Sequence, residues 1–144
     1  MKTEVFNLKD GKVEVSQFEN IIYFTVYGNF TDDDIVTLTK YTEDFFAKNN
    51  TPTIRIWDLT NMSAEQYNLT PAGIDRLDNW ADEAKKKWPG NAAYIIGVPD
   101  LIFGMSRMYE LKTSDNSMAI NVIKSVDELP DKIKIKISGK FAEK

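Results

Sequence analysis

The 144-residue chain has the length of one domain, and a composition of 42% hydrophobic and 28% charged residues is that of an ordinary globular protein. Its formal net charge of −4 gives no general basic surface for nucleic acid, and no apolar run is long enough to span a membrane. The chain has no cysteine and no histidine, which excludes disulfides and thiolate chemistry and removes the commonest general base and zinc ligand.

Three short strands are predicted at the N-terminal end. Residues 4–8 and 12–16 are strand-like and flank the pair Asp10-Gly11, which is typical of a hairpin turn. Residues 21–27 are rich in β-branched and aromatic side chains and end at Gly28, which predicts a third strand.

Helices and strands are predicted to alternate after this point. Thr31 begins the first helix, and the three acidic residues 32–34 in its first turn favour the helix dipole, an explanation that we prefer to a cation site. Residues 53–59 form a short apolar strand, and a loop then leads to Thr70-Pro71, a good start for a second helix. Residues 92–98 are apolar throughout, as expected of a central parallel strand covered on both faces. The apolar positions at helical spacing in the first helix are Ile35, Leu38, Thr42, Phe45 and Phe46.

The last part of the chain predicts a helix, a strand, a capped turn and a tail. A third helix is expected over residues 100–112 and a strand over residues 118–123. Residues 125–128 have the spacing of a capping box, which predicts a last short helix. Lysine and isoleucine then alternate with a period of two, which predicts an extra C-terminal strand at 132–138, either added to this sheet or reaching a neighbouring subunit.

This order predicts a single α/β domain over residues 1–144, with a mixed sheet of N-terminal antiparallel strands and parallel strands covered by helices. Sites in such folds lie at the carboxyl ends of the parallel strands. Asp58 and Thr60 at one strand end, and Asp100 at another, are therefore candidate ligand- or partner-binding residues. Asp58 can equally satisfy the amides of its own loop.

Three segments carry a family resemblance: "IIYFTVYGNFT" from Ile21, "TIRIWDLT" from Thr53, and "AAYIIGVPDLIFGMSRMYE" from Ala92. With the order of the elements, they resemble the SpoIIAA-like family over roughly residues 12–130. This is the bacterial STAS-type fold, which is related to anti-sigma-factor antagonists and grouped with lipid-binding Sec14 domains. The resemblance implies a compact α/β domain that often self-associates and has no settled biochemical activity.

The start of the second helix departs from the pattern of true anti-sigma-factor antagonists, which carry a phosphorylatable serine in the turn that opens this helix. Here Pro71 and Ala72 occupy the acceptor positions. We therefore expect no phosphoswitch of the usual kind, and Thr70, the nearby hydroxyl, remains a candidate binding residue.

The segment Phe103–Glu110 adds Ser106 and Arg107 to the candidates for ligand or partner binding. Arg107 can instead pair with Glu110 or with a loop carboxylate. Gly104 is costly inside a helix, and close packing of that helix against another backbone would explain it.

Three functions remain open. We expect a cytoplasmic, non-enzymatic regulatory or protein-interaction module that resembles STAS-type anti-sigma-factor antagonist domains, forms a homodimer, binds a protein partner and uses no metal or cofactor. The alternative is a Sec14-like carrier or sensor of a small apolar or lipid-like ligand, which an aromatic content of 12% allows. An enzyme that uses Asp58 or Asp100 ranks third, because the usual catalytic imidazole and thiol are absent.

Overall fold

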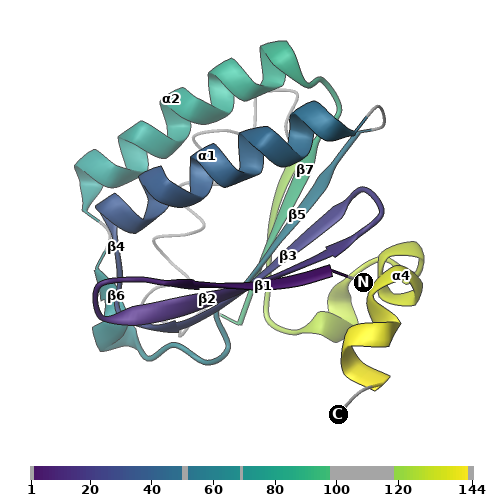
Figure 1. The fold of residues 1–144 in the computed structure, drawn as a ribbon, viewed down its shortest axis with the longest axis horizontal. Coiled ribbons are helices and arrows are strands. Elements are labelled where there is room, and N and C mark those ends of the chain that lie inside the picture. Colours follow the sequence, from purple (N-terminus) through teal and green to yellow (C-terminus); the bar gives the residue numbers. More distant parts are fainter. Residues whose placement is uncertain (1, 50–51, 69, 98–118, 143–144) are drawn as a thin grey trace.

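The computed structural model describes residues 2–49, 52–68, 70–97 and 119–142, which form an α/β fold around a six-stranded mixed sheet (Figure 1). In their order across the sheet, the strands are β1 (Lys2–Asn7), β2 (Gly11–Phe18), β3 (Ile21–Gly28), β5 (Ile54–Asp58), β7 (Ala92–Ile96) and β8 (Ala119–Ile123). The first three strands are antiparallel neighbours, whereas β5, β7 and β8 run parallel to β3. The predicted fold class is therefore confirmed.

The turn between β1 and β2 forms where the Asp10-Gly11 pair predicted it. The N–H of Leu8 donates to the carbonyl of Gly11 at 2.9 Å, and the N–H of Asn29 donates to the carbonyl of Asp10 at 3.0 Å. Gly28, at the end of β3, has a φ of +79°, and a side chain at this position would collide with the backbone of Asp10 and Gly11. Glycine therefore allows the end of β3 to lie directly against this turn.

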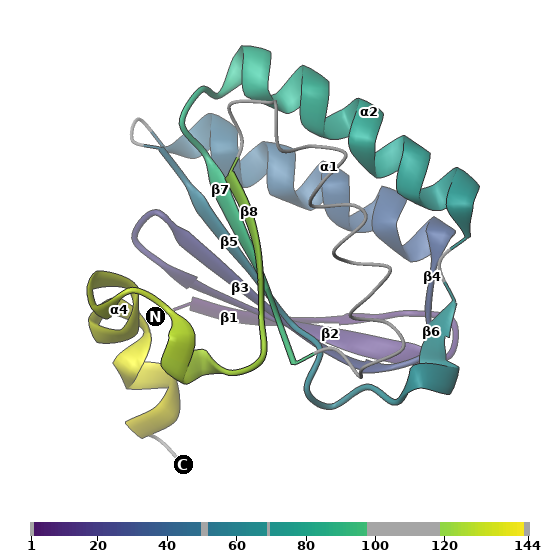
Figure 2. The same cartoon turned by 180° about the vertical axis from the view of Figure 1, so that it is seen from behind.

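Two helices, α1 (Asp32–Lys48) and α2 (Pro71–Lys87), connect the parallel strands and cover the same face of the sheet (Figures 1 and 2). The indole N–H of Trp80 in α2 donates to Glu43 of α1 at 2.7 Å and so links the two helices. Within the described residues, no helix is long and apolar enough to cross a membrane. The residues predicted to line the inner face of α1 are all buried, namely Ile35, Leu38, Thr42, Phe45 and Phe46.

The C-terminal tail is a helix, so the strand predicted at 132–138 is wrong. α4 (Asp131–Ala142) lies on the face of the sheet opposite to α1 and α2 (Figure 1). Residues four apart share one side of a helix, and Ile133 and Ile137 are accordingly buried, while Ile135 is 73% exposed. Isoleucines at every second position also include pairs that lie four residues apart, so the sequence pattern allowed either a strand or a helix. The tail therefore presents no isoleucine-lined strand to a second subunit, and one of the grounds for the expected homodimer is lost.

A second apolar core lies between α4 and the sheet, and burial in this core favours a helix over a strand in the tail. Its buried residues are Phe18, Ile21, Tyr23, Ile56, Ile96, Leu129, Ile133 and Ile137. The short helix η2 (Val126–Glu128) precedes α4 and is capped as predicted. The carboxylate of Glu128 accepts hydrogen bonds from the backbone N–H groups of Lys124 at 2.6 Å and Ser125 at 3.1 Å.

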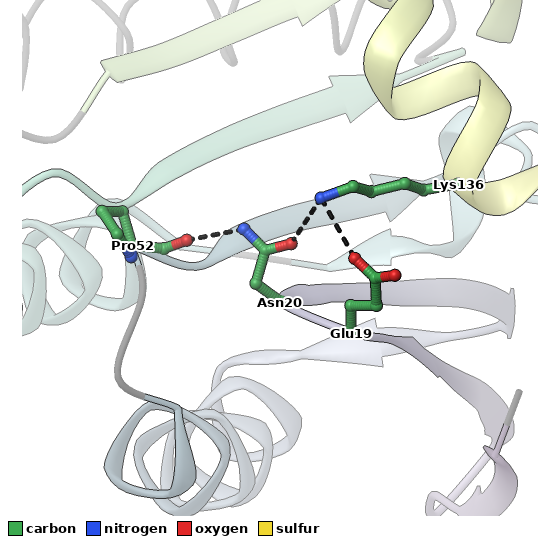
Figure 3. Close-up of polar contacts among 4 residues, drawn as sticks. All are labelled: Glu19, Asn20, Pro52 and Lys136. Atoms are coloured by element: carbon green, nitrogen blue, oxygen red, sulfur yellow. Dashed lines mark hydrogen bonds and ion pairs between the residues drawn. The ribbon is translucent and has the colours of Figure 1, made fainter.

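Lys136 fastens α4 to the turn between β2 and β3 (Figure 3). Its ammonium group lies 3.3 Å from the carboxylate of Glu19 and donates to the side-chain oxygen of Asn20 at 3.2 Å. The amide of Asn20 donates in turn to the carbonyl of Pro52 at 2.8 Å. Exposed ion pairs contribute only about 0–1 kcal/mol. We therefore assign the orientation of α4 to this network and its stability to the buried isoleucines.

Candidate functional site

Asp58 lies at the carboxyl end of β5, where a site was predicted, and both of its carboxylate oxygens are engaged. Tyr23 of the neighbouring strand β3 donates its hydroxyl to Oδ2 at 2.6 Å. Thr60 donates its backbone N–H at 3.0 Å and its hydroxyl at 2.6 Å to Oδ1. Tyr23 is fully buried and Asp58 is 7% exposed. Of the two roles considered for Asp58, this geometry supports the one in which the carboxylate satisfies its own loop, with an added link to β3.

The hydroxyls of Tyr23 and Tyr27, two residues of β3, are held in their protonated form. Burial, followed by the hydrogen bond to Asp58 and the charge of that carboxylate, raises the pKa of Tyr23 well above its usual value of about 10. Partial burial and the charge of Glu14 raise the pKa of Tyr27, whose hydroxyl lies 3.5 Å from the Glu14 carboxylate. Both phenols therefore act as hydrogen-bond donors to carboxylates at neutral pH and not as bases.

The N-terminal ends of α1 and α2 are held together by a small parallel sheet. Its strands are β4 (Phe30–Thr31) and β6 (Tyr67–Asn68), and the short helix η1 (Ala64–Gln66) lies in the predicted loop before β6. Asp34 accepts bonds from the backbone N–H of Thr31 at 2.8 Å and from its hydroxyl at 3.0 Å. One member of the acidic run 32–34 therefore caps its own helix.

Asp32 instead reaches across to the start of α2. Its carboxylate accepts a bond from the backbone N–H of Thr70 at 3.0 Å and a short second bond from the Thr70 hydroxyl. The Thr70 hydroxyl in turn caps α2 by accepting from the N–H of Gly73 at 3.1 Å. A side chain at Gly73 would collide with the Asp32 carboxylate. Glycine at this position is therefore what allows α1 to place a carboxylate on the start of α2.

Asp32 is charged in this position. Desolvation alone would raise the pKa of Asp32, but the two hydrogen bonds from Thr70 and the positive charge of Arg76 outweigh it and lower the pKa below its usual range. The partial positive charge of a helix N-terminus favours a carboxylate in the same way. The start of α2 thus carries an anion that belongs to the chain itself.

The predicted site residues fall into separate groups. Asp58 and Thr60 contact each other, whereas Thr70 contacts Asp32. Asp100, Ser106 and Arg107 lie outside the described residues, as do Gly104 and the predicted helix 100–112.

Two important residues of this region were missed from the sequence. Tyr23 belongs to a strand of buried apolar and aromatic residues and carries no local signal of its bond to Asp58, which is 35 positions away. Asp32 was assigned to the dipole of its own helix, and its bonds to Thr70 span 38 positions. An acidic residue in the first turn of one helix and a Thr-Pro pair at the start of the next are compatible with a contact between the two helix starts, but they do not predict it.

The sequence matches no protein-family model and no curated protein. The SpoIIAA-like resemblance accordingly remains a prediction that depends on the quoted segments. Among the residues that the structure describes, no group of three or more acidic side chains could hold a metal ion.

Proposed function

We propose that this protein is a non-enzymatic regulatory or protein-interaction module of the STAS type, and that its partner binds at the start of α2. One observation carries the proposal: the Asp32 carboxylate is seated on Thr70, at the N-terminus of this helix. In the anti-sigma-factor antagonists that the chain resembles, the turn that opens this helix carries the phosphorylated serine. Here a permanent carboxylate supplies negative charge next to the same turn.

This arrangement favours a module whose surface does not depend on phosphorylation. The Thr70 hydroxyl both donates to Asp32 and accepts from the N–H of Gly73, so its oxygen is engaged. Pro71 and Ala72 supply no hydroxyl. The charge at the helix start is therefore constant, and we propose that partner binding is constant as well.

The side chains around the helix start lie at the protein surface. Thr70, Pro71, Ala72, Asp75 and Arg76 are all exposed. They combine a rigid proline, a small residue and two opposite charges, which suits a polar and specific protein contact.

The interior polar groups support a structural role more than a catalytic one. The two carboxylate oxygens of Asp58 accept hydrogen bonds from Tyr23 and Thr60, and the raised pKa of Tyr23 keeps its hydroxyl protonated. A general base needs a carboxylate or phenolate oxygen that can reach a substrate proton. Asp58 meets this requirement only if its present bonds break.

The proposal is tested by binding experiments with two matched alanine variants. Ala72 and Ala47 are both exposed helix residues, but Ala72 lies at the start of α2 and Ala47 near the end of α1. Tyrosine is bulky and uncharged, so at either position it adds the same steric block without changing the helix dipole. Proteins captured from the native cells by the unmodified chain should be retained by Ala47→Tyr and lost by Ala72→Tyr. Equal retention by both variants would remove the start of α2 as the binding surface, and capture of no protein at all would overturn the interaction function.

A further inference from the structure

The sheet ends at β1 in a strand whose outer side pairs with no other strand among the described residues (Figure 1). At the hairpin end of the β1–β2 pair, the N–H of Leu8 donates to the carbonyl of Gly11 at 2.9 Å. Hydrogen-bonded and non-hydrogen-bonded residue pairs alternate along two antiparallel strands. The register of β1 with β2 therefore turns the backbone N–H and C=O groups of Thr3, Val5 and Asn7 away from β2, toward the outer edge.

This edge lacks the features that usually prevent an edge strand from pairing. Protected edge strands carry lysine or proline, or are bent by a bulge. Residues 3–7 contain neither lysine nor proline, and their register with β2 has no bulge. Val5, in the middle of the strand, is 54% exposed, and the uncharged Thr3 and Asn7 on either side of it are exposed as well. The outer edge of β1 can therefore accept another strand.

The charge of Glu4 determines how a second copy of β1 can pair with the first. Two such strands related by a twofold axis run antiparallel, and an outward-facing residue must lie opposite another outward-facing residue. If Thr3 lay opposite Val5 of the second copy, the two Glu4 side chains would lie directly opposite each other, which is unfavourable.

The register centred on Val5 avoids this repulsion. Val5 then lies opposite Val5 of the second copy, Thr3 opposite Asn7, and Glu4 opposite the uncharged Phe6. It is also the register in which all three outward-facing residues find a partner within the strand. The edge is therefore complementary to a second copy of itself in both charge and backbone hydrogen bonding.

We propose that two copies of this chain pair along β1, centred on Val5, and form one continuous sheet. The two Val5 side chains lie next to each other at the twofold axis, and each outward-facing N–H donates to a carbonyl of the other copy. The pairing occupies the β1 edge of both copies, so it ends at a dimer. It uses no residue at the start of α2 and therefore goes beyond the proposed interaction function.

The test compares two valine variants by light scattering up to high micromolar concentration. Val5 and Val36 of α1 are both exposed, at 54% and 42%, so Val5→Lys and Val36→Lys should each leave the fold intact. Val5→Lys places two ammonium groups opposite each other at the twofold axis and should remain a monomer. The unmodified chain and Val36→Lys should approach twice the monomer mass as the concentration rises.

Hydrogen exchange of the unmodified chain locates the contact. The N–H of Val5 points toward the second copy, whereas that of Phe6 points toward β2. Exchange at Val5 should slow about twofold when half of the chains are paired, and exchange at Phe6 should not change. Equal association of Val5→Lys and Val36→Lys, or unchanged exchange at Val5, would overturn the proposal. An unmodified chain that stays monomeric would overturn it as well and would leave the edge to a strand of another protein.

Discussion

Removal of the Tyr23 hydroxyl should reveal how much the link between β3 and β5 contributes to stability. In Tyr23→Phe the ring remains, so no large cavity forms, but Oδ2 of the buried Asp58 loses its 2.6 Å bond. Hydrogen bonds to charged groups contribute about 1.5–3 kcal/mol. We expect the free energy of unfolding to fall by this amount, because water cannot easily replace the lost donor at a fully buried position.

Tyr27→Phe is the matched control on the same strand. The Tyr27 hydroxyl lies 3.5 Å from the carboxylate of Glu14, at the outer limit of a hydrogen bond, and the residue is partly exposed. Its removal should change the free energy of unfolding by no more than about 0.5 kcal/mol.

Both variants can be compared by equilibrium unfolding in urea, monitored by tryptophan fluorescence. Trp57 is a suitable probe because it stacks on the buried Phe24, with ring centroids 4.1 Å apart. The midpoint should fall for Tyr23→Phe without a change in the dependence of stability on urea concentration. If Tyr23→Phe lies within about 0.5 kcal/mol of the unmodified protein, or loses no more than Tyr27→Phe, the bond to Asp58 does not stabilise the link between the two strands.

Four further outcomes are expected. The pKa of Tyr23 is raised in the folded state, so the contribution of its hydroxyl to stability is complete below the unfolded pKa of about 10 and is lost as the pH rises above it. In urea titrations above pH 10, the free energy of unfolding of Tyr23→Phe should therefore fall less steeply with pH than that of the unmodified protein, by about 1.4 kcal/mol per pH unit. Thr70→Ala should lower the free energy of unfolding by about 1 kcal/mol through loss of the helix cap. Phosphopeptide mapping of the native protein should find no stoichiometric phosphate on Thr70, and heavy modification of this residue would restore the phosphoswitch. In the urea assay Ile133→Ala should cost about 2–4 kcal/mol and Ile135→Ala less than about 0.5 kcal/mol, and equal losses would contradict the helical tail.

Much of the fold was predictable because its signals are local. The Asp10-Gly11 turn, the Thr70-Pro71 helix start and the capping box that ends at Glu128 each depend on residues within a few positions of one another. Such signals act through backbone geometry and short-range hydrogen bonds, which require no knowledge of the rest of the chain. The buried face of α1 was predictable for a similar reason, because its apolar spacing matches only a helix.

The tail shows where local information ends. Alternating lysine and isoleucine satisfies a strand at every second residue and a helix at every fourth, and β-branched isoleucine favours the strand. The choice depended on an apolar sheet face, beneath α4, that could bury Ile133 and Ile137. Only the assembled sheet provides that face.

The sequence by itself determined the order of the main strands and helices from β1 to β7, the main helix starts and the position of Asp58 at a strand end. Only the tertiary structure decided which polar groups meet, because Tyr23 and Asp58 lie 35 positions apart and Asp32 and Thr70 lie 38 apart. A hydrogen bond requires its atoms to lie within about 3 Å. Across such separations this distance is set by the register of the strands and the packing of the helices, which no short segment of the chain encodes.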